Sequence, residues 1–297
     1  MNKKLLVTGG TGLLGKGLTE TKIPGWDIVS THLRDYTVKD THAEHVICDI
    51  RNAGDIEKLF SKHHFDAVIH AAGIANVDYV ESHLQESRDS NINGTRIIAE
   101  LCKKHSAYMI YVSTNAVFDG KNPPFSETSK TNPVNEYGKI KLECEKIALG
   151  TNTDALVFRP ILMYGWAYPQ SRANPASWLV AKLSNGEEIK LVTDVYENPL
   201  YYIQCGNMLW QALELKPSGV IHAAGREKIN RYEFGLKVAK IFGFTDSKIS
   251  PVDSSFFPSI APRPKNTTFD VTKMQAKLKI HPLSIDEGLI DMLRRRK

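Results

Sequence analysis

The stretch TGGTGLLGKG, residues 8–17, directly follows the apolar run LLV near the start of the chain. Gly9, Gly12 and Gly15 give it a G-x-x-G-x-x-G spacing at a strand-to-helix junction. There the first glycine permits a tight turn, the second lets backbone approach a pyrophosphate, and the third lets the helix pack close to the sheet. The free N–H groups of the helix would face the phosphates. The stretch therefore predicts a dinucleotide-binding α/β fold, with a purely structural glycine turn as the alternative.

Short apolar runs alternate with helical patterns through the first half of the chain. Runs that are apolar on both faces suit strands of a parallel sheet covered on each side. Asn52 is a candidate helix cap, and residues 90–105 have helical periodicity and end in basic residues. The alternation predicts a doubly wound parallel sheet of the Rossmann type. The expected strands are residues 4–9, 26–31, 43–49, 66–73, 107–114 and 154–160.

The second half of the chain has a different texture, with frequent prolines and polar loops after Pro160. We therefore expect residues 1–160 to form the nucleotide-binding domain and residues 161–297 to form a smaller substrate-binding lobe. Ser284 and Glu287 have the spacing of a capping box, which predicts a last helix.

The pentapeptide IHAAG occurs at residues 69–73 and again at residues 221–225. Two copies are not a repeat architecture. The second copy predicts a buried strand that rejoins the main sheet, so that a segment of about 219–245 returns to it and the smaller lobe is interleaved with the first domain. His70 and His222 occupy equivalent places in the two copies, and we expect both to be buried and hydrogen-bonded rather than catalytic.

Composition excludes several classes of partner. A net charge of +5 on 297 residues is mild, and only residues 294–297 form a dense basic run, so nucleic acid is not expected. No window approaches the roughly 20 apolar residues of a membrane span, and the N-terminus lacks the apolar core of a signal peptide. These features predict a cytoplasmic protein that binds no metal, and a homodimer is compatible with them. The cysteines, expected to be reduced thiols without metal-ligand spacing, are Cys48, Cys102, Cys144 and Cys205.

The ends of the second and third strands bear on the choice of dinucleotide. An acid after the second strand would hold the ribose 2′-OH of NAD, whereas a basic residue would accept the 2′-phosphate of NADP. The chain reads IVSTHLRD there, with Arg34 in reach and Asp35 further along, which favours NADP with NAD as the alternative. After the third strand, Asp49 and Ile50 are expected near the adenine, although Asp49 could equally cap the next helix.

Further cofactor contacts are expected from the glycine stretch and from the end of the fourth strand, where small residues would let the cofactor lie against the strand. These residues are Thr11, Leu13 and Leu14, and Ala71, Ala72 and Gly73.

Residues 134–147, VNEYGKIKLECEKI, place Tyr137 and Lys141 four positions apart at the start of a predicted helix. Residues at i and i+4 share one helix face, so both side chains can reach one ligand. An amphipathic surface helix is the alternative. Thr114 ends a predicted strand, and a polar, proline-rich loop separates it from Tyr137 and Lys141. Its neighbour Ser113 points to the other face of that strand and is expected to be structural.

A Ser or Thr at a strand end, followed by Tyr-x-x-x-Lys, is the arrangement of the short-chain dehydrogenase/reductase superfamily. With TGGTGLLG at the N-terminus, the chain resembles the extended branch of that superfamily. It resembles more narrowly the dTDP-4-dehydrorhamnose reductase family and its relative, the regulatory β subunit of methionine adenosyltransferase. The resemblance covers nearly the whole chain and is carried by VFDGKNPPFSE, NEYGKIKLECE, RPILMYG and APRPKNTTFD, at residues 117–127, 135–145, 159–165 and 261–270.

The resemblance implies hydride transfer from a nicotinamide to a ketone carbon, with Tyr137 as general acid and Thr114 donating a hydrogen bond to the substrate oxygen. Tyr137 and Lys141 would also contact the cofactor, where Lys141 would hold ribose hydroxyls. Because an ordinary phenol has a pKa of about 10, we expect Lys141 to supply part of the lowering of the Tyr137 pKa toward neutrality and the positive charge of the oxidised nicotinamide to supply more. Asn91 matches the helix Asn that steadies the active site in this superfamily; a plain helix-start residue is the alternative.

Two positions depart from the family's usual pattern. Members usually read STDYVFDG, whereas this chain reads STNAVFDG, with Asn115 and Ala116, and Leu162 stands where the family usually has Trp. Both departures remove surface that would face a sugar, so the identity of the sugar stays open. The expected substrate contacts are Asn115, Leu162 and Arg263, with Arg172 as a further candidate partner of a diphosphate. The loop at 166–178 and the segment 254–266 are expected to line the pocket.

The leading hypothesis is an NAD(P)H-dependent reductase of a keto-sugar nucleotide, as in 4-dehydrorhamnose reduction. One alternative is a sugar-nucleotide epimerase or dehydratase with tightly bound NAD. A dehydratase would need further acid/base groups beside Thr114, and Asn115 and Ala116 supply none. The other alternative is a non-catalytic, NADP-binding regulatory subunit.

Overall fold

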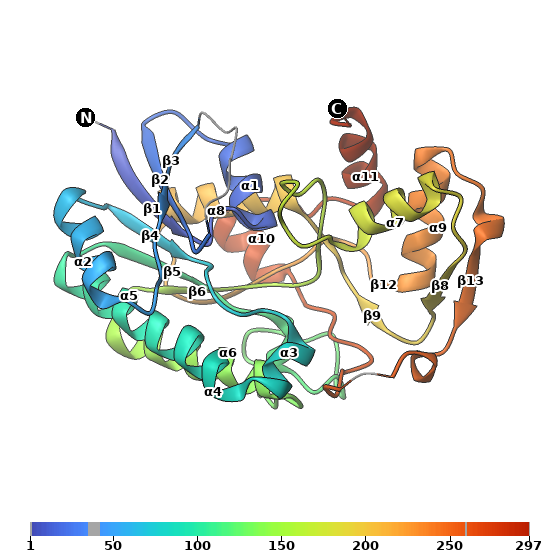
Figure 1. The fold of residues 1–297 in the computed structure, drawn as a ribbon, viewed down its shortest axis with the longest axis horizontal. Coiled ribbons are helices and arrows are strands. Elements are labelled where there is room, and N and C mark those ends of the chain that lie inside the picture. Colours follow the sequence, from blue (N-terminus) through green and yellow to red (C-terminus); the bar gives the residue numbers. More distant parts are fainter. Residues whose placement is uncertain (1, 35–41, 259, 297) are drawn as a thin grey trace.

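The computed structural model describes residues 2–34, 42–258 and 260–296, so Asp35 lies outside the described residues. A seven-stranded sheet of order β11-β6-β5-β4-β1-β2-β3 forms its centre (Figure 1), and every neighbouring pair of strands is parallel. The strand order therefore reverses at β1, which makes the edge beside β1 and β4 the topological switch point of a doubly wound sheet. The strands are β1 (Lys3–Thr8), β2 (Trp26–His32), β3 (Ala43–Ile47), β4 (Ala67–His70), β5 (Tyr108–Val112), β6 (Leu156–Pro160) and β11 (Gly219–Ala223).

The fold class and the strands expected from the sequence are confirmed, but several strands end earlier than expected. The fourth was expected to extend to residue 73 and the fifth to residue 114, whereas β4 ends at His70 and β5 ends at Val112. The residues that follow are small or polar, and they form the turns at the carboxyl edge of the sheet.

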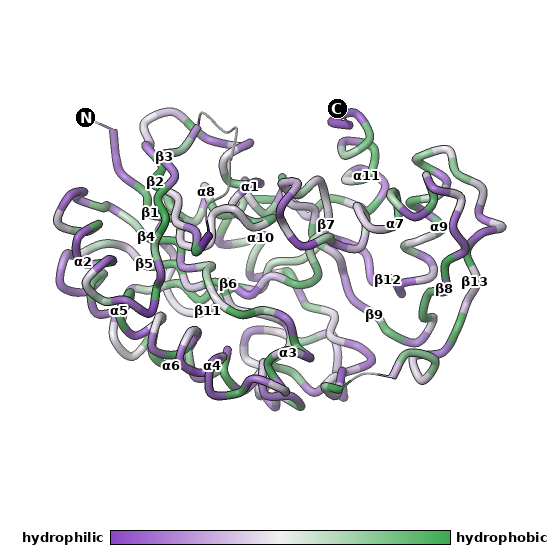
Figure 2. Tube along the Cα trace, viewed as in Figure 1, coloured by the Kyte–Doolittle hydropathy of each residue, from purple (hydrophilic) through white to green (hydrophobic). Residues whose placement is uncertain are grey.

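Helices cover both faces of the sheet, as Figure 1 shows. Strand alternation builds two cores, because Leu5 and Val7 of β1 enter one core while Leu6 enters the other. Figure 2 shows hydrophobic residues following β1 and its neighbours through the main body. The first core packs under α1 (Leu13–Glu20), α8 (Tyr202–Leu215) and α10 (Thr272–Leu278); the second packs under α2 (Ala53–Lys62), α5 (Gly94–Lys104) and α6 (Glu136–Thr151).

Polar caps determine where several helices begin. Asn52 accepts a hydrogen bond of 3.3 Å from the backbone N–H of Asp55 and caps α2, as predicted. Ser284 and Glu287 form the predicted capping box of α11 (Ile285–Arg294). A cap of this kind contributes about 1 kcal/mol to stability.

The segment between β4 and α5 is more irregular than the sequence suggests. The helix expected at residues 90–105 is divided, because a π-helical turn precedes α5. The segment comprises α3 (Val77–Ser82), α4 (Leu84–Arg88) and the π turn η1 (Asp89–Asn93).

The second lobe is built from short elements around a core of its own that includes Tyr164, Leu179, Phe234 and Leu289. Its strands form the parallel pairs β10-β7 and β13-β8 and the antiparallel pair β12-β9. Its elements are β7 (Met163–Tyr164), α7 (Pro175–Ser184), β8 (Ile189–Val192), β9 (Tyr196–Glu197), β10 (Leu200–Tyr201), β12 (Ile229–Asn230), α9 (Arg231–Phe242), β13 (Ile249–Val252) and α11, with the 3₁₀ turns η3 (Asp246–Lys248) and η4 (Ser254–Phe256). A further 3₁₀ turn, η2 (Asn115–Val117), follows β5 in the main domain.

Chain from the second half returns to the main sheet, although not over the expected range of about 219–245. Strand β11 does pair with β6, but α9 packs within the second lobe. The returning chain instead begins with α8, which lies against α1 at Gly17 and Gly206, where a Cβ on either glycine would overlap backbone of the other helix. The division of the chain at residue 160 remains a prediction.

The described residues contain no helix long and apolar enough to cross a bilayer, and no group of three or more His, Cys, Asp or Glu side chains arranged to hold a metal ion. The four cysteines are buried and unpaired, which agrees with the expected free thiols.

Candidate functional site

The glycine turn after β1 meets the end of β4 at the switch point. Gly9 has φ +70°, and a Cβ there would lie 2.8 Å from the Cα of Ala72. A Cβ on Gly15 would lie 2.5 Å from the Cα of Gly10. Gly12 precedes α1 in an extended conformation and provides no side-chain cap. The backbone here is therefore packed so closely that a Cβ at Gly9 or Gly15 would overlap it, and this turn, the glycine cradle, leaves the first amides of α1 without a capping side chain, as an anion site requires.

Gly10 was missed by the sequence interpretation, which assigned roles only to the glycines of the spaced pattern. Its N–H donates to the carbonyl oxygen of Thr31 at 3.1 Å, and a Cβ there would lie 3.0 Å from the Cβ of Ser30. The doubled glycine in TGGTG was the available signal, because only a residue without a side chain fits between β1 and β2.

A segment of the second lobe reaches over the glycine turn. The hydroxyl of Ser171 donates to the carbonyl oxygen of Thr11 at 2.6 Å, and Lys16 Nζ donates to the carbonyl oxygen of Ala167 at 3.4 Å. Of the other predicted cofactor residues in the turn, Leu14 is buried and Leu13 begins α1. The loop expected at 166–178 thus lies beside the predicted cofactor site.

The predicted adenosine end lies after β2 and β3. Arg34 is exposed beyond the end of β2. The Asp49 carboxylate accepts a 2.6 Å hydrogen bond from Arg51 Nη2, and this interaction holds the pKa of Asp49 below its ordinary value. Because Asn52 caps α2, the alternative role of Asp49 as that cap is excluded. Ile50 is buried against α5, where a Cβ on Gly94 would lie 2.7 Å from its Cδ1.

Asn91 holds the loop that follows β4. Its Oδ1 accepts from the N–H of Ile74 at 2.7 Å, and its Nδ2 donates to the carbonyl oxygen of Ile74 at 3.1 Å. This loop includes Gly73, which has φ +151°. The Asn91 carbonyl oxygen accepts from Thr95 Oγ1 at 2.5 Å and from Cys144 Sγ at 3.3 Å. Asn91 therefore joins the loop to α6 from within a π turn and is not a plain helix-start residue; such turns often occur at functional sites.

Thr114 and Tyr137 converge at the carboxyl end of β5. Thr114 is buried, and its hydroxyl lies close enough to the half-buried Tyr137 phenol to lower the pKa of that phenol. Burial raises the pKa of Tyr137 to about 12, against the lowering effects of Thr114 and of the Arg172 charge. The expectation that groups of the chain lower this pKa toward neutrality is therefore wrong, because desolvation of the phenolate outweighs its polar contacts.

Lys141 lies on the same helix face but makes a different contact from the one expected. Its Nζ donates to the carbonyl oxygen of Val112 at 2.7 Å and lies 4.4 Å from the ring centre of Tyr111. Burial lowers the pKa of Lys141 to about 8. The cation whose charge lowers the pKa of Tyr137 is Arg172, from the loop after β7.

The two histidines of the repeated pentapeptide are buried and hydrogen-bonded, as predicted. The His70 ring lies 2.7 Å from the Thr8 hydroxyl and 3.1 Å from the Thr95 hydroxyl. The His222 ring lies within hydrogen-bond distance of the carbonyl oxygen of Phe125, at 3.1 Å, and of the guanidinium of Arg159, at 3.2 Å. Burial lowers the pKa of each to about 3, so both are neutral at physiological pH.

The three predicted substrate residues lie in different settings. Asn115 Nδ2 donates to Thr267 Oγ1 at 2.7 Å and to Glu197 Oε1 at 3.1 Å, joining β5 to the second lobe. Leu162 is half-buried against the first core. Arg263 forms an ion pair of 2.6 Å with Asp78 of α3. Its guanidinium is thus already engaged by the chain itself.

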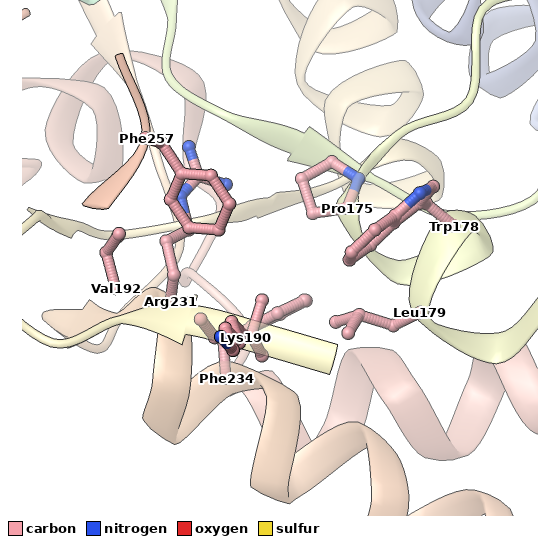
Figure 3. A pocket seen from close by; sticks show the side chains of 9 residues that line it. Pro175, Trp178, Leu179, Lys190, Val192, Arg231, Phe234 and Phe257 are labelled. Carbon is pink, nitrogen blue, oxygen red and sulfur yellow. The ribbon is translucent and has the colours of Figure 1, made fainter. Parts of the chain in front are cut away.

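A cavity of about 290 Å³ lies in the second lobe between α7, β8 and the start of α9 (Figure 3). Trp178 and Phe257 stand on opposite sides of it, and both come from segments that were expected to line the substrate pocket. Arg231 was missed; its guanidinium lies 2.6 Å from the carboxylate of Glu197. The lining residues are Pro175, Trp178, Leu179, Lys190, Leu191, Val192, Arg231, Phe234 and Phe257. The cavity surface is mostly apolar, and aromatic walls of this kind suit a flat ligand; of the two cations in the lining, Arg231 is paired with Glu197 and Lys190 Nζ lies 4.3 Å from the ring centre of Phe256.

A run of contacts connects this cavity with the end of β5. Arg231 pairs with Glu197, and Glu197 accepts from Asn115, which directly follows Thr114.

Comparisons with known proteins agree with this geometry. A family model described as "RmlD substrate binding domain" matches residues 3–297. Methionine adenosyltransferase 2 subunit beta of Bos taurus is 29% identical over 290 residues, which are 92% of this chain and 82% of that protein. A Haloferax volcanii protein named "Probable low-salt glycan biosynthesis reductase Agl14" is 27% identical over 289 residues, 95% of each chain.

Solved structures of similar fold include two sugar-nucleotide enzymes. The dTDP-4-dehydrorhamnose reductase of Bacillus anthracis, in complex with NADP, matches with a TM-score of 0.89 and 24% identity over 100% of both chains. The UDP-glucose 4-epimerase of Thermotoga maritima matches with a TM-score of 0.85 and 22% identity over 98% of this chain and 97% of that chain. At these identities the likeness shows the shared fold.

Proposed function

The chain belongs to the RmlD substrate binding domain family, and on that premise we propose that it is an NADP(H)-dependent reductase of a keto-sugar nucleotide. The observation that carries the proposal is the convergence of the Thr114 and Tyr137 hydroxyls at the carboxyl end of β5. The glycine turn after β1 lies at the same edge, because the carboxyl ends of parallel strands share one edge of a sheet.

The glycine cradle suits a dinucleotide, because no side chain caps the first amides of α1 and these can bind a pyrophosphate. Residues 28–34 contain no acid, which supports NADP over NAD, with Arg34 as the proposed partner of the 2′-phosphate. Bound NADPH would supply the hydride.

The chain's own residues would donate the proton and orient the substrate oxygen. With a pKa of about 12, Tyr137 holds its proton at Oη at neutral pH and can donate it to an oxygen that becomes an alkoxide. The Thr114 hydroxyl lies beside the phenol and can orient the same oxygen. Lys141 is the proposed partner of the cofactor ribose.

We assign the nucleotide end of the substrate to the second-lobe cavity. Trp178 and Phe257 offer ring faces to a base, and Arg231 and Lys190 offer charge to a diphosphate. This assignment gives the diphosphate to Arg231, which lines the cavity, in preference to Arg263, which does not.

The test is NADPH oxidation by the purified protein with a panel of 4-keto sugar nucleotides, followed by absorbance. Tyr137→Phe should lower kcat by about 100-fold or more, the range of a lost general acid, while NADPH binding stays within about 3-fold. A protein that binds NADPH but oxidises it with none of these substrates would contradict the proposal. Tightly held NAD in the purified protein would instead favour an epimerase.

A non-catalytic subunit is the second candidate, favoured by the relatives named methionine adenosyltransferase 2 subunit beta, at 26–29% identity over 92% of this chain. Sedimentation of the chain with the methionine adenosyltransferase of its source organism tests it. A complex that forms equally with wild type and Tyr137→Phe, together with no reductase activity in either, would support this candidate.

A further inference from the structure

A buried ion pair joins α6, the helix that carries Tyr137, to β6. Glu145 of α6 accepts hydrogen bonds from Arg159 Nη2 at 2.6 Å and from Arg159 Nε at 2.8 Å. The hydroxyl of Ser113 also donates to Glu145. The side chains of Glu145 and Arg159 are only 4% and 5% exposed, and among the ion pairs of the described residues this is the one with both partners so deeply buried.

The ion pair is placed on the face of α6 that carries the proposed catalytic residues. Tyr137, Lys141 and Glu145 succeed one another at four-residue steps, so they share one side of the helix. Lys141 donates a hydrogen bond to the carbonyl oxygen of Val112, the last residue of β5. The Glu145 carboxylate accepts a hydrogen bond from the hydroxyl of Ser113, the next residue along the chain. Two consecutive turns of α6 are therefore tied to two consecutive residues that lead into Thr114.

The other side of the pair is fixed by the neighbouring strands. Arg159 lies in β6, and its Nη1 donates to Nε2 of His222 in β11 at 3.2 Å. The opposite ring nitrogen of His222 then carries the proton and donates to the carbonyl oxygen of Phe125 at 3.1 Å. Each donor of this chain has an acceptor, so the carboxylate has one well-defined position.

The position of this carboxylate has a consequence for the proposed reaction. A buried ion pair is weak evidence for stability, because apolar residues of similar volume would serve as well or better. Its bidentate geometry does, however, fix direction and distance closely. The pair holds Glu145 of α6 against β6, and the Ser113 hydroxyl then connects the fixed carboxylate to the end of β5 that leads to Thr114.

We propose that Glu145, held by Arg159 and Ser113, is a positioning residue that sets the distance between the Tyr137 and Thr114 hydroxyls. The proposal rests on the proposed reductase function for its kinetic readout. Because displacement of a reacting group by about 1 Å can lower a rate about 100-fold, loss of the ion pair should act on kcat rather than on binding.

The experiment uses the full chain and three variants. Glu145→Gln breaks the pair, and Glu145→Gln with Arg159→Met removes both buried charges. Glu143→Gln is the matched control, because Glu143 makes the same kind of pair on the same helix, with Arg88 at 2.9 Å, but at the surface. Ser113→Ala is a milder change that tests the proposal even if Glu145→Gln does not fold, since it removes one hydrogen bond and keeps both charges.

We expect kcat to fall about 10-fold or more in Glu145→Gln, with KM for NADPH within about 2-fold, and to fall less in Ser113→Ala. The double variant should regain the melting temperature of the wild type but not its kcat. Glu143→Gln should behave like the wild type. If kcat recovers together with the melting temperature, the role of the pair is only structural and the proposal is overturned.

If the wild type itself reduces no substrate, the proposed function fails and crystal structures decide the positioning proposal. In the double variant the distance between Thr114 Oγ1 and Tyr137 Oη should grow beyond hydrogen-bond reach. An unchanged distance would overturn the proposal independently of any activity.

Discussion

The ammonium of Lys141 donates a 2.7 Å hydrogen bond to the carbonyl oxygen of Val112 at the end of β5. The side chain is buried, and burial lowers the pKa of the amine from 10.5 to about 8. In the unfolded chain the amine titrates near its ordinary value. The folded state therefore binds fewer protons than the unfolded state between about pH 8 and 10.5, so this group costs stability below pH 8 and the cost disappears as the pH rises to 10.5.

Lys141→Met should therefore make the protein more stable at pH 7 while it abolishes the proposed activity. The pKa difference corresponds to about 3 kcal/mol, and loss of the hydrogen bond to Val112 reduces the expected gain to about 2 kcal/mol. Urea unfolding at pH 7 and pH 10 measures this, and the gain should be absent at pH 10. Lys139→Met is the control, because Lys139 pairs with Glu136 at the surface, and its effect should stay within about 0.5 kcal/mol. A destabilised Lys141→Met protein at pH 7 would contradict the prediction.

Gly9→Ala should destabilise the protein and weaken NADPH binding. The left-handed backbone at Gly9 and the 2.8 Å approach of a Cβ to Ala72 together should cost about 2–3 kcal/mol. We expect the Kd for NADPH, measured by fluorescence, to rise at least about 10-fold. Gly150→Ala is the control: a Cβ at Gly150 meets nothing within 4 Å, and the residue lies in α6, so this change should stabilise by about 0.5–1 kcal/mol. Equal NADPH affinity in Gly9→Ala and the wild type would be inconsistent with the glycine cradle.

The parts of the fold that the sequence predicts correctly are those with local signals. The glycine spacing places the turn after β1, apolar runs place the strands, and Asn52 and Ser284 mark helix starts. These features depend on residues within a few positions of one another. The π turn at Asn91 leaves no such signal, because it depends on hydrogen bonds to Ile74, on the far side of α3 and α4.

The parts that sequence reasoning missed depend on contacts between distant segments. Arg231 belongs to the candidate site because Glu197 holds it, and two-residue strands such as β9 have no periodicity to reveal this. The pKa of Tyr137 depends mainly on the burial of the phenol, which the residue spacing within α6 does not reveal. The spacing of Tyr137 and Lys141 predicted a shared helix face, but not that Lys141 would bond to Val112.

Arg231→Met should weaken binding of a sugar nucleotide without affecting the cofactor. Loss of a charge-assisted contact to a diphosphate should raise KM for the substrate about 10-fold or more, while KM for NADPH stays within about 2-fold. Steady-state kinetics with each ligand varied in turn measures both. Arg226→Met is the control, because Arg226 forms only an exposed pair with Glu287 at 3.3 Å. A rise in KM for NADPH alone would place the cofactor, rather than the substrate, in this cavity.

Asn115→Asp should create a pH-dependent defect that Glu197→Gln repairs. The Asn115 amide donates to Glu197 at 3.1 Å, so a carboxylate in its place would lose that hydrogen bond and face a like charge. Two carboxylates at this distance repel each other, and the repulsion raises their pKa above the ordinary value. The folded protein therefore loses stability as the pH rises through this raised pKa and both groups become charged. We expect a loss of about 2 kcal/mol at pH 8 and little loss at pH 4.5, measured by urea unfolding.

The matched control for that substitution is Asn185→Asp, because Asn185 donates to Glu187 at 3.4 Å on an exposed surface and its change should stay within about 0.5 kcal/mol. In Asn115→Asp with Glu197→Gln, the new carboxylate can accept from the introduced amide, so most of the lost stability should return. The family's usual Asp at this position would then be excluded from this chain by Glu197, which also pairs with Arg231. A defect of equal size at both pH values, unrepaired by Glu197→Gln, would show instead that the hydrogen bond to Thr267, at 2.7 Å, is what requires the amide.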